Sequence, residues 1–247
     1  MRLDVAFTPT GLGGAEVQGR TVFVVDILRA TTTICAALHH GARAVIPAAS
    51  TEEALRLGQT LDSDDVLLAG ERNTERIPGF ALGNSPLEMT PEAVRGKLLV
   101  LSTTNGTGAL LAAQAAATVY LAAAVNIGRA GERAREIYRG GGDLLVMCAG
   151  REGGFGLDDA YCAGRLVEVA IEDRRETAGL NDAALASLDL VRRYGERWER
   201  PLRLSAAGQE LTAAGFKADI VEAAKPNAYP VLPQFADRRV TADAGTS

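Results

Sequence analysis

Short apolar segments rich in β-branched residues alternate along the chain with alanine-rich segments of helical periodicity. The apolar segments predict seven strands, at residues 4–7, 22–27, 44–46, 66–69, 98–101, 119–122 and 144–148. Helical patterns follow most of these strands, at residues 32–40, 51–60, 107–115, 127–138 and 158–171. Short strands that are apolar on both faces are typical of parallel sheets covered by helices. The pattern therefore predicts an α/β fold, with a mostly parallel sheet, helices on both of its faces and right-handed crossovers.

The C-terminal part of the chain has a different pattern. Residues 181–224 are predicted to be mainly helical, and they either cover the sheet or form a small subdomain. Residues 236–247 lack apolar periodicity, and we expect them to form a frayed tail. Because no linker or internal repeat divides the chain, residues 1–235 are predicted to form a single α/β domain.

Polar residues gather where four of the predicted strands end. Ligands of open parallel sheets bind beyond the carboxyl ends of the strands, where helix N-termini offer unpaired N–H groups and a positive dipole end to an anion. One such cluster is explained equally well by helix capping, but four favour a common site. The predicted ligand-binding residues are Thr31, Thr32, Arg72, Asn84, Ser85, Thr103, Thr104, Asn105, Gly106 and Thr107.

Three arginines, Arg29, Arg72 and Arg151, each follow a predicted strand within a few residues. A lone arginine in a loop is usually solvated, whereas three together could converge on a small polyanion. The planar guanidinium fork matches the oxygen atoms of phosphate and carboxylate. We therefore expect a small anionic ligand, with catalytic roles for Arg29 and Arg151.

Four carboxylates also lie at strand ends or helix starts: Asp26, Glu71, Asp158 and Asp159. Oxygen ligands of this kind, together with a substrate phosphate, suit Mg²⁺. We expect these four residues to include the metal ligands, with Asp26 also catalytic. Two structural alternatives remain open at this point: a strand-end ion pair between Asp26 and Arg29, and a favourable charge–dipole interaction of Asp158 and Asp159 with a helix N-terminus.

Composition and charge exclude several classes of protein. Of the 247 residues, 47% are hydrophobic, which is enough for a full core. The net charge of −5 and the lack of a long basic run argue against nucleic acid as a partner. No uninterrupted apolar stretch reaches the roughly 18 residues of a membrane span. An odd count of three cysteines and an N-terminus without a signal-peptide pattern predict a cytoplasmic protein without a disulfide scaffold.

Several known motifs are absent or incomplete. The chain has no P-loop pattern, and only two residues separate Cys148 from Arg151, too few for a loop that encircles a phosphate. The only histidines, His39 and His40, lie at a predicted helix end, where a cation is favourable, so we expect structural roles for them. A zinc site built on two histidines is therefore not expected.

Five motifs occur in a fixed order along the chain: VVDILRATTT at 24–33, AGERN at 69–73, GFALGNSP at 79–86, STTNGTGAL at 102–110 and CAGREGGFGLDDAYCAG at 148–164. In these motifs the chain resembles the 2-phosphosulfolactate phosphatase family, from residue 4 to about residue 219. The resemblance implies an α/β fold particular to that family. It also implies a Mg²⁺-dependent phosphatase that converts 2-phospho-3-sulfolactate to 3-sulfolactate and phosphate, a step towards coenzyme M.

Two other functions stay open alongside this one. The first is a phosphatase of a related small phospho-acid, because family membership does not determine the substrate. The second is a protein that binds a phosphorylated metabolite without turnover. Assembly as a homo-oligomer is compatible with each of them.

Overall fold

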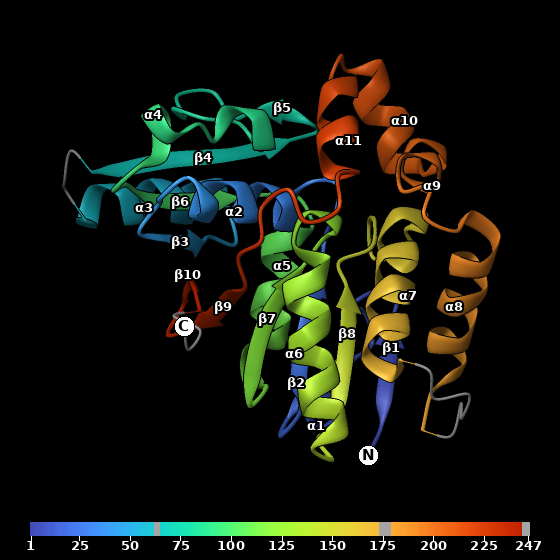
Figure 1. The fold of residues 1–247 in the computed structure, drawn as a ribbon. Coiled ribbons are helices and arrows are strands. Elements are labelled where there is room, and N and C mark those ends of the chain that lie inside the picture. Colours follow the sequence, from blue (N-terminus) through green and yellow to red (C-terminus); the bar gives the residue numbers. More distant parts are fainter. Residues whose placement is uncertain (62–64, 173–178, 244–247) are drawn as a thin grey trace.

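The strands of the computed structural model form one mixed sheet in the order β1-β8-β2-β7-β9-β10-β3-β6-β4-β5 (Figure 1). The structure describes residues 1–61, 65–172 and 179–243. All seven predicted strands are present in it. The strands are β1 (Leu3–Ala6), β2 (Thr21–Val25), β3 (Ala44–Pro47), β4 (Val66–Arg72), β5 (Glu75–Arg76), β6 (Leu98–Ser102), β7 (Thr118–Ala122), β8 (Leu144–Cys148), β9 (Pro233–Ala236) and β10 (Arg239–Ala242).

The sheet consists of two parallel groups of strands. Strands β1, β8, β2 and β7 are parallel to one another, and so are β3, β6 and β4. The hairpin of β9 and β10 joins the groups through antiparallel pairings with β7 and β3. In Figure 1 the first group stands upright and the second runs across the view. Prediction of a mostly parallel sheet is confirmed, but the sheet turns at its centre.

The second strand of the joining hairpin, β10, lies in the segment 236–247, which the sequence predicted to be a frayed tail. That prediction is wrong for β10, in which Val240 is fully buried and pairs with Val45 of β3. The turn of the hairpin, Asp237 and Arg238, has a left-handed backbone. Only Val240 is buried in β10, so the strand carries no apolar run that the sequence could reveal, and its stability comes from neighbours distant along the chain. Residues 244–247 of the predicted tail lie outside the described residues.

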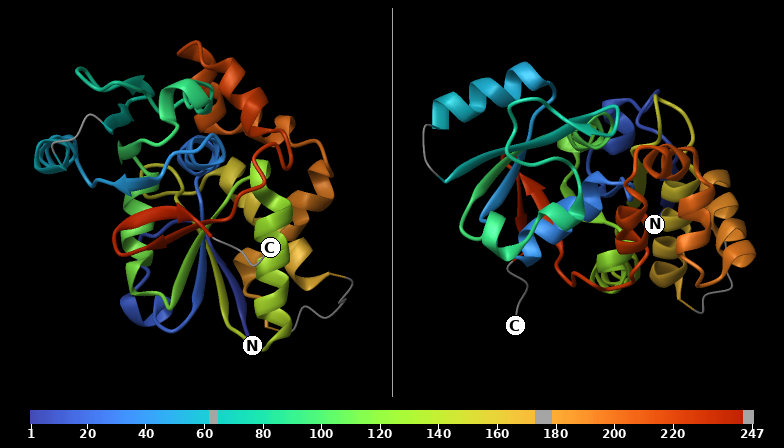
Figure 2. Two further views of the ribbon diagram at one scale, coloured as in Figure 1. Left: turned by 60° about the vertical axis from the view of Figure 1, so that its left-hand side comes forward. Right: turned by 90° about the horizontal axis from the view of Figure 1, so that it is seen from above.

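Helices cover both faces of the sheet (Figure 2). The α-helices are α1 (Gly14–Val17), α2 (Ala30–His39), α3 (Thr51–Leu61), α4 (Pro91–Val94), α5 (Gly106–Ala112), α6 (Ile127–Arg139), α7 (Leu157–Ile171), α8 (Asp182–Tyr194), α9 (Glu199–Leu204), α10 (Ala206–Ala213) and α11 (Lys217–Ala223). Short 3₁₀ turns occur at η1 (Pro86–Glu88), η2 (Ala113–Ala115) and η3 (Ala124–Asn126). Helix α2 contacts β3, β7 and β9 between the two groups of strands, which explains why nine of its ten residues are buried.

The helical segment predicted for residues 181–224 contains α8 to α11. Helix α8 packs against α7 and β1, whereas α9, α10 and α11 form a cap above the end of α7 (Figure 1). The described part of the chain contains no helix that is long and apolar enough to cross a membrane. Cys35, Cys148 and Cys162 are buried and unpaired.

Candidate active site

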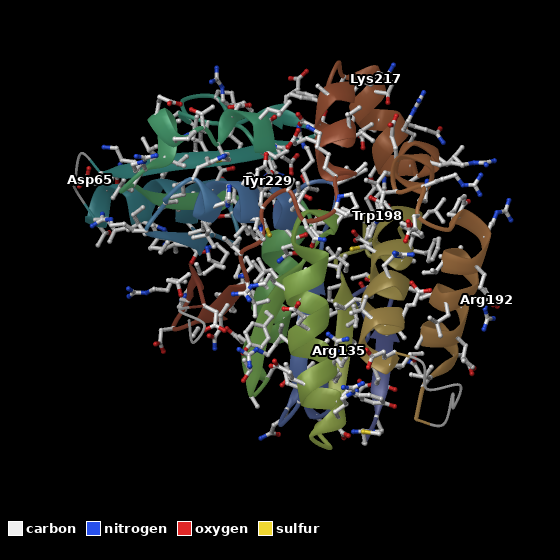
Figure 3. The ribbon with its side chains drawn as sticks, in the orientation of Figure 1. Asp65, Arg135, Arg192, Trp198, Lys217 and Tyr229 are labelled. Atoms are coloured by element: carbon white, nitrogen blue, oxygen red, sulfur yellow. The ribbon has the colours of Figure 1, made fainter. Side chains whose placement is uncertain are left out.

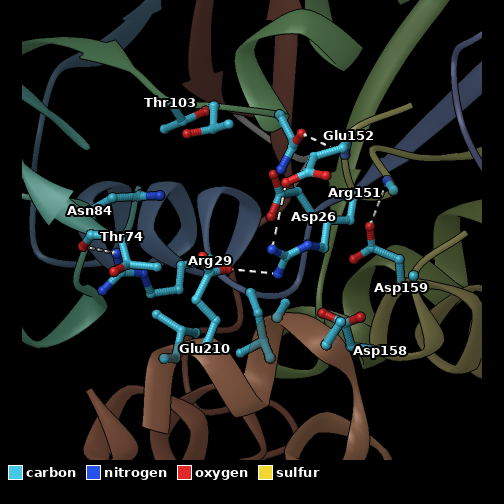
Figure 4. A pocket seen from close by; sticks show the side chains of 18 of the residues that line it. Asp26, Arg29, Thr74, Asn84, Thr103, Arg151, Glu152, Asp158, Asp159 and Glu210 are labelled. Carbon is cyan, nitrogen blue, oxygen red and sulfur yellow. Dashed lines mark hydrogen bonds and ion pairs between the residues drawn. The ribbon is translucent and has the colours of Figure 1, made fainter. Parts of the chain in front are cut away.

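A pocket lies where the carboxyl ends of both groups of strands meet helix α10 of the cap (Figure 4). All four predicted polar clusters contribute to its wall, as one cleft requires. The predicted residues that line it are Asp26, Arg29, Glu71, Asn84, Thr103, Thr104, Asn105, Arg151, Asp158 and Asp159. Because the two groups of strands turn towards each other, the carboxyl ends of both groups meet at this pocket.

Asp26 directly follows β2 and is 7% exposed. Its Oδ1 atom accepts a hydrogen bond from the Ala30 N–H at 3.2 Å. Burial raises the pKa of Asp26 from 3.8 to about 7; the Ala30 N–H opposes this shift, and the neighbouring carboxylates Asp158 and Glu71 add to it. The fold therefore holds a carboxyl group in a place where a proton or a cation is needed to neutralise it.

This shift predicts a stability change in Asp26→Asn. The folded protein retains the Asp26 proton up to about pH 7, whereas the unfolded chain releases it near pH 3.8. Stability contributed by this group therefore falls as the pH rises from about 4 to about 7 and stays low above that. Without divalent metal at pH 8, we expect the variant to exceed the original protein by about 2–4 kcal/mol in free energy of unfolding.

Urea denaturation in EDTA at pH 4 and pH 8 measures this difference. The asparagine Oδ1 can still accept the Ala30 N–H, so the local hydrogen bond is retained. The advantage of the variant should be large at pH 8 and small at pH 4. Equal stabilities at pH 8 would mean that Asp26 ionises at its usual pH and is not held in a destabilised charged form.

Asp158 and Asp159 lie in the first turn of α7. Burial raises the pKa of Asp158 to about 6, against hydrogen bonds from the backbone N–H groups of Asp158 and Asp159 and from Ser205. Burial, followed by the charges of Asp158 and Asp26, raises the pKa of Asp159. The oxygens of Asp159 accept the N–H groups of Ile27 and Gly150 at 2.9 and 3.0 Å. Asp159 thereby holds together the loops after β2 and β8, while Asp158 has fewer backbone partners from other loops.

Glu71, near the end of β4, likewise holds loops together. Its Oε1 accepts the N–H and hydroxyl of Thr104 at 2.7 and 2.8 Å, and its Oε2 accepts the Thr74 N–H at 3.0 Å. These contacts connect the β4–β5 turn to the loop after β6. The carboxylates of Glu71 and Asp159 are thus used to join separate loops, whereas Asp26 and Asp158 accept the backbone N–H groups of their own helix starts.

Arg29 is 4% exposed and lies at the base of the cap. Its guanidinium donates to Asp219 Oδ2 of α11 at 2.7 Å and to the Thr74 carbonyl at 2.9 Å, and it lies 4.6 Å from the centre of the Phe216 ring. Asp219 also accepts the Ser85 hydroxyl at 2.7 Å. The expected alternative of an isolated Asp26–Arg29 pair is therefore wrong: in the described residues, Arg29 forms its ion pair with the cap.

Arg151 lies in the tight turn after β8 and is partly exposed. Its guanidinium donates to Glu210 Oε2 of α10 at 2.6 Å and lies 3.6 Å from Glu152 Oε1 (Figure 4). The turn is closed by reciprocal backbone hydrogen bonds between Arg151 and Gly154, with Glu152 in a left-handed conformation. Arg151 is thus the arginine of the site that solvent reaches.

Asn84 contributes a buried polar atom that lacks a partner. The residue is 4% exposed, and its Oδ1 receives no hydrogen bond from the described residues. Its backbone carbonyl accepts the Thr33 hydroxyl at 3.0 Å, which anchors the segment to α2. An unpaired buried oxygen costs free energy unless a ligand, a water molecule or an ion satisfies it, so Asn84 offers a hydrogen-bond acceptor to whatever binds in the pocket.

Four predicted ligand-binding hydroxyls have protein partners and do not line the pocket wall. Thr31 and Thr32 donate to the carbonyls of Asp26 and Ile27, both at 2.8 Å, and they hold the start of α2. Thr107 donates to the Thr103 carbonyl at 3.1 Å. Ser85, as described above, donates to Asp219. The structure therefore does not place these four hydroxyls in the pocket wall, since nearby backbone satisfies the three threonines and the Asp219 carboxylate satisfies Ser85.

Arg72 also lies outside the pocket wall. Its neighbour Glu71 lines the pocket, and successive side chains of a strand point to opposite faces. Arg72 therefore points away from the pocket, where it donates to the Ser102 hydroxyl at 2.9 Å and to the Glu71 carbonyl at 2.7 Å. Arg72 was expected in the site because it lies near the end of a strand, but the alternation of side chains along β4 places it on the opposite face.

Gly106, the first residue of α5, does not line the wall but abuts Asp26. A Cβ atom added at Gly106 would clash with the Ala30 side chain and lie 2.5 Å from Asp26 Oδ2. A Cβ atom at Gly108, two residues later in the same helix, would meet no heavy atom within 4 Å. Glycine is therefore required at the first position for close approach, and not at the second.

This contrast predicts opposite effects of two alanine substitutions. Gly106→Ala should destabilise the fold by about 1–3 kcal/mol through overpacking and should displace the Asp26 carboxylate. Gly108→Ala should stabilise it by about 0.5–1 kcal/mol, since alanine is the better helix former. Thermal unfolding of both variants measures the difference. Equal behaviour of the two variants would contradict the close approach at Gly106.

The pocket also contains residues that the sequence did not single out. Those near the predicted clusters are Asn73, Thr74, Glu152 and Phe155, and those from the cap are Ala206, Ala207, Glu210 and Leu211. The cap residues lie in a segment whose only sequence signal is helical periodicity. His39 and His40 contact Tyr229 and lie outside the wall of the pocket, as expected for structural histidines.

The candidate metal ligands in the pocket wall are oxygen atoms of carboxylates and of an amide. Within residues 1–61, 65–172 and 179–243, no three His, Cys, Asp or Glu side chains are grouped as metal ligands. Mg²⁺ commonly takes only one or two protein carboxylates and completes its coordination with water and phosphate. The buried carboxylates Asp26 and Asp158, with the unsatisfied Asn84 oxygen, fit such a hard cation.

Comparisons with known proteins agree with the resemblance seen in the motifs. The sequence model of the 2-phosphosulpholactate phosphatase family matches residues 6–238. A probable 2-phosphosulfolactate phosphatase of Symbiobacterium thermophilum is 40% identical over 91% of this chain and 95% of its own. Proteins of the same name are 35% identical in Caldanaerobacter subterraneus, over 95% of both chains, and 40% identical in Deinococcus radiodurans, over 85% of both.

Proposed function

The chain belongs to the 2-phosphosulfolactate phosphatase family, and from this premise we propose that it is a phosphoric monoester hydrolase that converts 2-phospho-3-sulfolactate to 3-sulfolactate and phosphate with Mg²⁺. The observation that carries the proposal is the pair of buried carboxylates, Asp26 and Asp158, facing a pocket that also contains Arg29 and Arg151. A role on the route to coenzyme M is part of the proposal and rests on the family resemblance alone. A cytoplasmic location and a homo-oligomeric state stay predictions.

The charge of the pocket supports a need for a cation. Among the described residues, its wall carries two guanidinium groups, of Arg29 and Arg151, and six carboxylates, of Asp26, Glu71, Glu152, Asp158, Asp159 and Glu210. The proposed substrate carries phosphate, carboxylate and sulfonate groups. So many carboxylates would repel such a polyanion unless bound cations or protons neutralise them.

Asp26 and Asp158 would hold Mg²⁺, directly or through water, with Asn84 Oδ1 as a further acceptor for that water. When bound, the ion would supply charge neutralisation and polarisation of the phosphoryl group. Glu71 and Asp159 would keep the loops in place around these ligands. Phosphoryl transfer depends mainly on positioning and charge stabilisation, which suits a wall assembled from four loops.

The two arginines would bind different parts of the ligand. Arg29 is held in place by its hydrogen bonds to Asp219 and to the Thr74 carbonyl. It would present the remaining edge of its guanidinium to the substrate. Arg151 is more exposed and would bind an anionic group at the pocket mouth. Helix α10 and Phe155 flank that mouth and would limit the access of water to the phosphoryl group.

Phosphate release from a panel of small phosphoesters, with and without Mg²⁺, tests the proposal. We expect the highest kcat/KM for 2-phospho-3-sulfolactate and loss of turnover in EDTA. A higher value for another phospho-acid would favour a related phosphatase. Tight binding by calorimetry without phosphate release would favour a metabolite-binding protein and would overturn the proposal.

A further inference from the structure

The guanidinium of Arg151 is already occupied by a carboxylate of the same chain. Glu210 Oε2 accepts its hydrogen bond at 2.6 Å, and both side chains line the pocket. In Figure 4, Glu210 extends from the cap helix towards the guanidinium. The guanidinium donors that bind this carboxylate are the same donors that would bind a phosphate, carboxylate or sulfonate oxygen of a ligand.

The cap is attached to the sheet in two unequal ways. On one side, the Arg29–Asp219 pair is buried, with each side chain 3% exposed. On the other side, the Arg151–Glu210 pair is partly open, with side chains 29% and 44% exposed. Breaking a buried pair is costly, whereas an exposed pair contributes little stability. The contact at Glu210 is therefore the one that a ligand can replace.

We propose that Glu210 is a specificity-determining residue that competes with the ligand for Arg151. A tethered carboxylate acts at an effective concentration in about the millimolar range. A ligand that presents a weakly held anionic group does not displace it, whereas a group that binds the guanidinium more strongly does. Glu210 thus selects for highly charged ligands. Arg151 binds either Glu210 or the anionic group of the ligand, but not both at once. This inference rests on the proposed function only for the identity of the anion.

Binding of inorganic phosphate, measured by calorimetry in Mg²⁺ buffer, tests the competition without requiring turnover. We expect Glu210→Gln and Glu210→Ala to bind phosphate about threefold to fivefold more tightly than the original protein, as expected when an exposed pair no longer competes. KM for the anionic substrate should fall by a similar factor, with a smaller change in kcat.

A matched control exists on the same cap. Glu199 is paired with Arg203 at 3.4 Å, and its side chain is 46% exposed, close to the 44% of Glu210. Glu199 does not line the pocket. Glu199→Gln removes the same charge from the cap and should leave phosphate affinity unchanged.

A double variant separates competition for Arg151 from a general change in charge. In an Arg151→Gln background, Glu210→Gln should no longer alter phosphate affinity, because the contested donors are gone. Tightening that persists in this background, or no tightening in the single variants, would overturn the inference. So would a failure of the original protein to bind phosphate at millimolar concentration. A protein that binds phosphate as expected but hydrolyses no phosphoester would refute the proposed function and retain the competition.

Discussion

Asp26→Asn should lower Mg²⁺-dependent phosphate release by about three orders of magnitude or more while the protein stays folded. The carboxylate lies at the junction of both groups of strands, against Gly106 and beside Asp158. Asparagine keeps the shape of the side chain but cannot carry the charge that a cation needs. The measurement is kcat/KM over a range of Mg²⁺ concentrations.

The stability of the same variant separates a chemical effect from misfolding. Since Asp26→Asn should be more stable than the original protein at pH 8, lost activity together with raised stability identifies a functional carboxylate. Asp143→Asn is a suitable control, because Asp143 contacts Arg2 near the amino-terminal edge of the sheet and lies outside the pocket. Near-normal activity of Asp26→Asn with unchanged Mg²⁺ dependence would show that Asp26 is neither a metal ligand nor a nucleophile.

Asp219→Ala should reduce the free energy of unfolding by about 3–5 kcal/mol. The substitution leaves the Arg29 guanidinium buried without its counter-charge and removes the acceptor of the Ser85 hydroxyl. It also detaches α11 from the base of the pocket. Chemical denaturation measures the loss, and phosphatase activity should fall as Arg29 loses its position.

Two further variants test whether this loss of stability comes from the buried ion pair. Asp189→Ala, in an exposed pair with Arg192 that points into solvent from α8 (Figure 3), should change stability by no more than about 0.5 kcal/mol. Replacing both members of the buried pair, as Arg29→Met with Asp219→Leu, should recover much of the stability but not the activity. A stable and active Asp219→Ala variant would rule out the pair as the anchor of the cap.

Strands and helices of the main sheet follow directly from the sequence. Apolar runs such as 98–101 and 144–148 can be buried on both faces only as inner strands, and the patterns after them suit helices alone. The polar residues that interrupt these patterns at strand ends identify the region of the site, including Asp26, Asn84 and Asp158. The predictions of the strands, helices and fold class are confirmed because burial and periodicity are local properties that a segment carries with it.

The partners of those residues depend on segments far apart in the chain. Arg29 is paired with Asp219, 190 positions later, and Arg151 with Glu210, 59 positions later. No local pattern marks Asp219 or Glu210, because a helix with an acidic residue on its surface looks the same whether or not an arginine faces it. Glu71 and Arg72 point to opposite faces of β4, and the packing of distant segments decides which of these faces borders the pocket.

The sheet itself shows the same division. The seven strands of the two parallel groups are evident from their apolar runs, but the β9–β10 hairpin that unites them has few buried residues, with only Val240 buried in β10. Its stability comes from pairing with β7 and β3, and the turn that it imposes brings two sets of strand ends together. Composition and periodicity therefore determine which segments are buried and which ends are polar. Pairing, charge neutralisation and the shape of the pocket arise only when distant segments meet, because hydrogen bonds and ion pairs need both partners in place.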